Sequence, residues 1–187
     1  LASMGDMLGV LKGALVNHVV RKVKKMVPAF QLPGAVRFNE ALAIGRRKSY
    51  TEPKVGADDI AVLQYTGGTT GVSKGAVLLH RNLVANLLQA EAWYQPALKK
   101  IPAGEQIVTV CALPLYHIFG FNTNMMLSMR MGGCNVLIAN PRDIPATLKE
   151  LSQVKFHSFP AVNTLFNAIA HHADFNKVDW SSLKISI

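Results

Sequence analysis

Residues 65–75 carry the residue types and spacing that most favour chemistry in this chain, reading Tyr-Thr-Gly-Gly-Thr-Thr-Gly-Val-Ser-Lys-Gly. Glycine lets the backbone adopt positive φ and approach a ligand closely. Consecutive N–H groups in such a turn form a concavity that binds anions. Hydroxyl groups add donors, and lysine adds a mobile positive charge. The segment therefore predicts a cradle for nucleotide phosphates. The residues expected to contact them are Thr66, Gly67, Gly68, Thr69, Thr70, Gly71, Ser73 and Lys74.

A plain flexible turn and a Walker A loop are the two alternatives for this segment. A flexible turn needs glycine or serine, but not this density of threonine. A Walker A loop requires a lysine directly after its last glycine, followed by serine or threonine. Here Val72 and Ser73 separate Gly71 from Lys74, and Gly75 follows the lysine. A P-loop-like ATP-binding module therefore remains the weaker alternative.

A second candidate site follows residues 106–113, which read as an apolar strand ended by Pro114. Ligand crevices of open α/β sheets lie at the carboxyl ends of strands, so Tyr116 and His117 would stand at such a crevice. His117 is able to donate to a carboxylate whether it is neutral or charged. Phe121, one helical turn further on, would face the same cavity. The alternatives are a structural histidine that caps the next helix and a plain core phenylalanine.

The remaining histidines and cysteines predict no metal site. His171 and His172 are adjacent, so on a helix they point in different directions, and no third ligand lies nearby in the sequence. Cys111 and Cys134 lie far apart and form no CxxC pair. We expect both to stay reduced in a cytosolic core, with a disulfide as the alternative.

Residues 65–75 closely resemble the phosphate-binding signature of the adenylate-forming superfamily, Tyr/Phe-Thr-Ser-Gly-Thr-Thr-Gly-x-Pro-Lys-Gly. This superfamily contains acyl-CoA synthetases, adenylation domains of peptide synthetases, and luciferases. The chain departs from the signature at Gly68, where serine is common, and at Ser73, where proline is common. The first change removes one possible hydroxyl contact, and the second leaves the loop less stiff. The Thr-Thr-Gly core and the lysine are kept.

The resemblance also implies roles for residues further along the chain. In this family a segment similar to Pro114–His117 borders the acyl pocket, with its histidine near the substrate carboxylate, and an aromatic residue at the position of Phe121 gates a fatty-acyl tunnel. Residues 159–165 resemble a segment that lines the same cleft. The implied catalytic residues are Lys74 and His117. The implied substrate-binding residues are Tyr116, His117, Phe121, Phe159 and Pro160.

The function that the resemblance implies is that of an AMP-forming long-chain fatty acid–CoA ligase of the bacterial type. Such an enzyme uses ATP, Mg²⁺ and coenzyme A to convert a fatty acid to acyl-AMP and then to acyl-CoA. The alternatives within the superfamily are a peptide-synthetase adenylation domain and an aryl-CoA ligase. The resemblance is strong over residues 58–187, and the adenine-binding turn of the family would follow Ile187. We therefore expect an incomplete N-terminal domain that is inactive by itself.

Composition and charge limit the kinds of partner that the chain is expected to have. The chain has 187 residues, half of them apolar, and a net charge of +9. Residues 1–57 contain ten Lys or Arg and three Asp or Glu, but no aromatic residues interleave the basic clusters, which argues against a nucleic-acid surface. No apolar run is long enough to span a membrane. We expect a cytoplasmic protein whose basic helix either packs on the core or lies peripherally on the inner face of the membrane, and we keep homo-oligomerisation open.

The pattern of elements predicts an α/β fold. Apolar spacing predicts an amphipathic helix over 8–27 and a shorter one over 36–47. From residue 59 onward strands alternate with helices, which predicts a mostly parallel sheet with helices on both faces. Expected strands are 60–65, 76–79, 106–113, 135–139, 155–159 and 183–187, and expected helices are 80–93, 117–131, 143–153 and 161–171. The expected domains are a basic helix and linker region over 1–57 and a partial adenylate-forming domain over 58–187.

Overall fold

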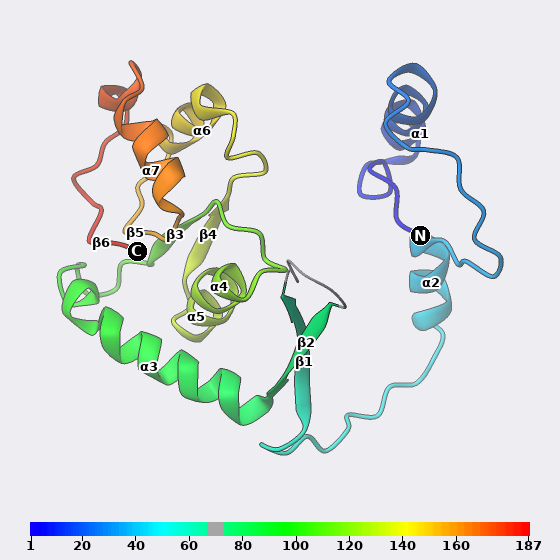
Figure 1. Cartoon of the computed structure of the whole chain (residues 1–187), viewed down its shortest axis with the longest axis horizontal. Helices are drawn as coiled ribbons and strands as arrows, with labels where there is room; N and C mark the ends of the chain where they lie inside the picture. The colour runs from blue at the N-terminus through cyan, green and yellow to red at the C-terminus, as the bar shows by residue number, and fades with distance from the viewer. Residues whose placement is uncertain (67–72) are drawn as a thin grey trace. The chain divides into compact units, whose positions relative to one another are not determined.

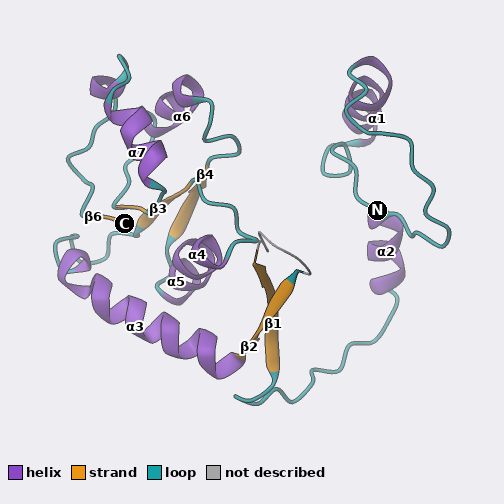
Figure 2. Cartoon of the chain, in the orientation of Figure 1, coloured by secondary structure: helices purple, strands orange, loops and turns teal. Residues whose placement is uncertain are grey.

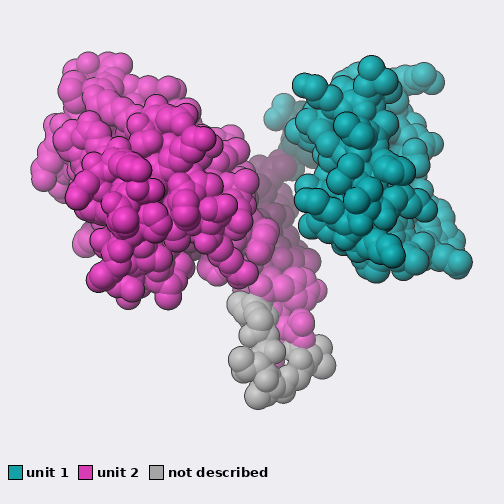
Figure 3. Space-filling model, turned by 90° about the horizontal axis from the view of Figure 1, so that it is seen from above, with its two compact units in different colours: residues 1–54 teal, residues 55–187 magenta. Residues whose placement is uncertain are grey.

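The computed structural model describes residues 1–66 and 73–187. Two compact units are present, Leu1–Lys54 and Val55–Ile187, coloured separately in Figure 3. Among the described residues, no helix is long and apolar enough to cross a membrane.

The first unit contains the helix α1, Val10–His18, which continues as a π-helical turn over Val19–Val23, and the helix α2, Phe38–Gly45 (Figure 1). The predicted helix over 8–27 is therefore present but changes its hydrogen-bond pattern halfway. The apolar stripe along it stays open, with Leu11 87% and Leu15 65% exposed. Helix α1 instead packs through Gly13, where an added Cβ would lie 2.5 Å from the carbonyl oxygen of Gly5.

The second unit begins with a β-hairpin. Strand β1, Ile60–Thr66, pairs antiparallel with β2, Lys74–Leu79. Both strands were expected, but they form a two-stranded sheet of their own, distinct from the parallel sheet. The helix α3, His80–Leu98, follows β2 without a break, and the Asn82 side chain accepts a hydrogen bond from the N–H of Leu79 at its start.

The parallel sheet has four strands in the order β4-β3-β5-β6. These are β3, Val108–Cys111; β4, Cys134–Leu137; β5, Ser158–Phe159; and β6, Ile185–Ser186. All three pairings are parallel. A helical segment joins β3 to β4. It consists of α4, Ile118–Gly120, a π-helical turn, Phe121–Met126, and α5, Leu127–Arg130. Helix α6, Ile144–Leu151, joins β4 to β5, while α7, Asn163–Ala170, and a 3₁₀ turn, Phe175–Lys177, lie between β5 and β6.

Helices cover both faces of this sheet (Figure 2). On one face, side chains of α6 and α7 such as Leu148, Leu151 and Ile169 are buried with Val110 and Phe159 of the strands. On the other face, α3 and α5 contribute a smaller cluster of Leu87, Tyr94 and Leu127. Full burial of one such side chain stabilises the fold by about 1.5–3 kcal/mol. The predicted α/β class, with a parallel sheet between helices, is thus confirmed.

Candidate functional site

The glycine- and threonine-rich segment connects the two strands of the hairpin. Thr66 ends β1 and lies opposite Lys74, the first residue of β2, so the register brings the two ends of the segment together. Ser73 and Lys74 are exposed beside this junction. The expected contacts Gly67, Gly68, Thr69, Thr70 and Gly71 lie outside the described residues. A Walker A loop leads from a strand into a helix, whereas here the segment leads into a second strand.

Gly75 shows why a small residue follows the lysine. It lies opposite Tyr65 across the hairpin, and the ring of Tyr65 covers it. An added Cβ at this position would lie only 3.3 Å from the ring, closer than ordinary van der Waals contact. The glycine therefore keeps the tyrosine packed at the base of the segment, next to Lys74.

A large cavity opens at the carboxyl edge of the parallel sheet, where β3, β4 and β5 end. We call it the sheet-edge cavity. Its volume is about 940 Å³, within the range usual for small-molecule sites. Its wall consists of Ala112, Leu113, Pro114, Leu115, Tyr116, Ile138, Ala139, Pro141, Arg142, Ile144, Val162, Thr164, Leu165 and Ala168. Most of these side chains are apolar, so the cavity suits an aliphatic ligand, in the place where open α/β sheets bind ligands.

Tyr116 and His117 stand at this edge. Tyr116 lines the cavity and is 86% exposed. His117 is the N-cap of α4, and its Nδ1 accepts a hydrogen bond from the N–H of Phe119 at 3.2 Å. This contact gives neutral His117 its proton on Nε2, which leaves an exposed N–H donor. The capping role and the donor role expected from the sequence are therefore compatible.

Gly120 fixes the start of this helical segment against the cavity wall. It is buried, and an added Cβ would lie 2.6 Å from the carbonyl oxygen of Pro114. The backbone of α4 therefore packs directly on the turn that carries Tyr116 and His117. Phe121 follows, half-buried, with its N–H bonded to the carbonyl of His117, and it does not line the sheet-edge cavity.

Phe159 and Pro160 are core residues. Phe159 is 1% exposed and makes edge-to-face contacts with Phe156 and Phe166, at 6.2 Å and 5.3 Å between ring centroids. Pro160 is also fully buried. The cavity wall is formed by the residues just beyond them, Val162 and three positions of α7. Val162, Thr164 and Leu165 lie within residues 159–165, the segment that the resemblance places along the cleft. Ala168 of α7, and Ile138 and Arg142 after β4, were not expected there, although the end of each parallel strand was a usable signal.

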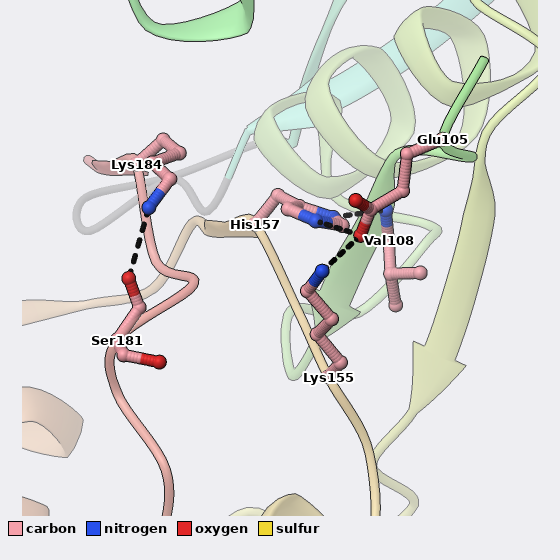
Figure 4. A network of polar contacts seen from close by, with 6 residues as sticks. All are labelled: Glu105, Val108, Lys155, His157, Ser181 and Lys184. Carbon is pink, nitrogen blue, oxygen red and sulfur yellow. Dashed lines mark hydrogen bonds and ion pairs between the residues drawn. The ribbon is translucent and has the colours of Figure 1, made fainter. Parts of the chain in front are cut away.

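A polar network around the buried His157 lies at the other end of β3 (Figure 4). His157, 2% exposed, accepts from the N–H of Val108 at Nδ1, and its Nε2 lies 3.0 Å from Oε1 of Glu105. Lys155 forms an ion pair with the same oxygen. The hydrogen bond from Lys155, joined by that of His157, lowers the pKa of the Glu105 carboxyl below its ordinary value. Because Val108 starts β3, this network ties β5 to β3 far from the sheet-edge cavity, which gives it a structural role.

Metal and thiol chemistry find no support in the described residues. No group of three or more His, Cys, Asp or Glu is arranged there to hold a metal ion. Cys111 and Cys134 are both free, and burial raises the pKa of the Cys111 thiol. A raised pKa disfavours the thiolate, so Cys111 is not an activated nucleophile.

Comparisons with known proteins agree on one family. The model of the family described as AMP-binding enzyme matches residues 8–187. A long-chain-fatty-acid–CoA ligase of Salmonella typhimurium is 51% identical over 186 residues, which cover 100% of this chain and 32% of the relative. The corresponding ligase of Haemophilus influenzae is 45% identical over 190 residues, with 100% and 33% covered. The chain thus spans about a third of the length of these relatives.

Solved structures show the same fold. ATP-bound MatB from Rhodopseudomonas palustris is 25% identical, with a TM-score of 0.59 over 74% of this chain and 25% of that one. The N-terminal domain of FACL13 from Mycobacterium tuberculosis is 20% identical, with a TM-score of 0.62 over 88% of this chain and 40% of that one. McyG A-PCP with phenylalanyl-adenylate is 19% identical, with a TM-score of 0.64 over 92% of this chain and 26% of that one. At these identities the last two show the fold alone.

Proposed function

We propose, because the chain belongs to the family of AMP-binding enzymes, that it forms part of a long-chain fatty acid–CoA ligase. One observation carries the proposal: the relatives that are 45–51% identical over the whole chain are all long-chain-fatty-acid–CoA ligases. The 4-coumarate–CoA ligase of Arabidopsis thaliana is only 30% identical, over 81% of the chain. Identity therefore favours a fatty acid over an aryl acid as the substrate.

The proposed reaction has two steps. The fatty carboxylate attacks the α-phosphorus of ATP and releases pyrophosphate, and the thiol of coenzyme A then attacks the acyl carbon and releases AMP. The carboxylate is itself the nucleophile, so the first step needs no protein nucleophile and little proton transfer. The chain's task in that step is to position the two substrates and to stabilise charge on the phosphate oxygens.

The hairpin segment is the proposed phosphate site. Lys74 would place its ammonium group on the phosphates, and Thr66, Thr69, Thr70 and Ser73 would donate from their hydroxyls. Gly67, Gly68 and Gly71 would let the backbone N–H groups approach. The register that brings Thr66 opposite Lys74 supports this, because it holds the two ends of the segment together.

Mg²⁺ is proposed to accompany ATP. The described residues contain no carboxylate or histidine cluster that could cage an ion, which fits an ion held mainly by phosphate oxygens and water, as is usual for Mg²⁺. Hydroxyl oxygens of the hairpin segment are the ligands that this chain would add to the ion. When bound, the ion would neutralise phosphate charge during adenylation.

The acyl substrate is proposed to occupy the sheet-edge cavity. Its apolar wall would bury the aliphatic chain, with Tyr116 at the rim, and the Nε2–H of His117 would donate to the carboxylate. Three of the expected substrate-binding residues would not contact the acyl chain themselves. They would support the backbone of the cavity wall: Phe121, Phe159 and Pro160. Phe159 is well placed for this, because it packs on Phe166 of α7.

The first unit is proposed to contact the inner face of a membrane from the cytoplasm. Helix α1 leaves Val10 90% and Leu11 87% exposed, and it carries Lys12, with Arg21 and Lys22 on its π-helical continuation. Apolar and basic groups on one helix are typical of segments that lie on anionic lipid surfaces.

Fatty acid, ATP and coenzyme A are the proposed small-molecule partners, and no nucleic acid is proposed as a partner.

A chimera tests the proposed activity. The 187 residues would replace the matching segment of the Salmonella typhimurium ligase, with which they share 51% identity. We expect the chimera to catalyse palmitate-dependent exchange of pyrophosphate into ATP, and to prefer palmitate to 4-coumarate. A folded chimera that prefers 4-coumarate, or that exchanges pyrophosphate without any acid, would contradict the proposal.

A further inference from the structure

Among the described residues, Arg142 is the one charged residue that lines the sheet-edge cavity. It lies on the turn between β4 and α6, is exposed, and contributes to a wall that is otherwise apolar apart from Tyr116 and Thr164. No carboxylate of residues 1–66 or 73–187 contributes to this wall. The cavity therefore presents an apolar interior with a single positive charge.

Among the described residues, the neighbouring acid Asp143 forms no ion pair with Arg142. Oδ1 of Asp143 accepts a hydrogen bond from the N–H of Ala146 at 3.1 Å and so caps α6. The N–H of Asp143 is bonded to the carbonyl of Asn140, which fixes the turn on which Arg142 stands. Within the described part of the chain, every ion pair of a lysine or arginine uses another residue: Arg81, Arg130, Lys155 and Lys177.

We propose that Arg142 binds the anionic head of a fatty acid whose chain enters the sheet-edge cavity. This inference rests on the proposed function and adds a residue that selects the acid. A guanidinium matches a carboxylate in a two-pronged geometry, and the apolar wall gains free energy by covering methylene groups. Coenzyme A fits the same wall poorly, because its pantetheine amides would need hydrogen-bond partners.

Arg142 acts in binding and not in the chemical step. His117, at the start of α4, is the group proposed to donate to the carboxylate during adenylation. Loss of an interaction made equally in the bound substrate and in the transition state raises KM and leaves kcat unchanged. In the chimera, Arg142→Gln should therefore raise KM for palmitate without lowering kcat.

The test measures binding to the 187-residue chain itself, without ATP. Dodecanoate and dodecan-1-ol, both below their aggregation limits, would compete with a fluorescent fatty acid. Arg142→Gln should weaken dodecanoate binding about 2- to 5-fold, as expected for an exposed ion pair, and should leave dodecanol unchanged. Arg142→Lys should keep most of the affinity. Arg81→Gln, which removes an arginine paired with Asp58 outside this cavity, should change neither ligand.

A second variant tests the cavity. Ala168→Phe narrows the wall contributed by α7 and should weaken the acid and the alcohol alike. The inference is overturned if the wild-type chain does not bind dodecanoate, or if Arg142→Gln binds dodecanoate as tightly as wild type does. It is also overturned if Arg142→Gln weakens the binding of dodecanoate and of dodecanol equally. A chimera without pyrophosphate exchange would refute the proposed function, while Arg142-dependent dodecanoate binding would still stand.

Discussion

Lys74 and His117 each combine a structural position with a proposed chemical role, so their variants have to separate the two. Lys74 opens β2 opposite Thr66, and His117 caps the helix whose backbone packs on Pro114. Both side chains are exposed. Substitution of an exposed side chain usually changes the free energy of unfolding little. Well-chosen substitutions should therefore reduce activity without an equal loss of stability.

Lys74→Ala should slow adenylation far more than it destabilises the fold. A charge-assisted hydrogen bond to phosphate contributes about 1.5–3 kcal/mol, or roughly ten- to hundred-fold in rate. The measurement is pyrophosphate exchange in the chimera, beside thermal unfolding of the 187-residue chain. Lys149→Ala, on the exposed surface of α6, is the matched control. Exchange at the wild-type rate in Lys74→Ala would rule out the phosphate assignment.

His117→Asn and His117→Ala distinguish the cap from the donor. Asparagine is among the best N-cap residues, whereas alanine costs about 1 kcal/mol at this position. We therefore expect His117→Asn to keep the unfolding free energy near wild type but lose activity, and His117→Ala to lose both. Urea unfolding and pyrophosphate exchange measure the two quantities. Full activity in the asparagine variant would reduce His117 to a capping residue.

At the scale of elements, the network of Glu105, Lys155 and His157 should make stability depend on pH. The pKa of Glu105 is lowered in the folded chain, chiefly by the hydrogen bond from Lys155. A lowered carboxyl pKa adds stability that is present above the unfolded-state pKa and is lost as pH falls through the folded-state pKa. Urea unfolding between about pH 7 and pH 3 should show this loss in wild type and a flatter profile in Glu105→Gln. Equal slopes in the two proteins would show that another group carries the dependence.

Local elements were predictable from the sequence because their signals are local. Alternating apolar residues and turn signals located the strands, and Asp143 indicated the start of α6, which its side chain caps. Sheet membership was not predictable in the same way. The sequence pattern of residues 60–65 and 76–79 predicts strands of the parallel sheet. Which strands pair depends on contacts between distant parts of the chain, and these two strands pair with each other instead.

The residues of the candidate site also differ in whether a local signal in the sequence indicates them. Tyr116 was predictable at the cavity because it lies on the turn that follows the carboxyl end of β3. Val162, Thr164 and Leu165 were expected along the cleft from the resemblance of residues 159–165. Arg142 was harder to place, because it meets the cavity only after β4 has paired beside β3, and its position after a parallel strand was the only local signal. His157 gave no signal in the sequence, because its burial depends on Val108 and Glu105, which lie far away along the chain.

At the scale of the whole molecule, charge is concentrated in the first unit, and this predicts lipid binding. Each Lys or Arg close to an anionic leaflet contributes about 1 kcal/mol. Replacing Arg21, Lys22, Lys24 and Lys25 by glutamine should therefore strongly reduce co-sedimentation with vesicles that contain phosphatidylserine. Removing four charges from the second unit (Lys99, Lys100, Lys149 and Lys177) should have little effect. Equal pelleting of all three proteins would exclude the proposed contact.

The topology of the second unit also sets a time order for folding. Thr66 pairs with Lys74, its near neighbour along the chain, and β-hairpins form in about 1–10 μs. The parallel sheet instead needs Thr109 of β3 to find Ser158 of β5, with a helix, a strand and another helix between them, and such distant pairings slow folding. Pulse-labelled hydrogen exchange should therefore protect amides of β1 and β2 before those of β3 and β5. The proposed nucleotide cradle would then be framed before the cavity for its second substrate exists, and simultaneous protection of both sheets would contradict this order.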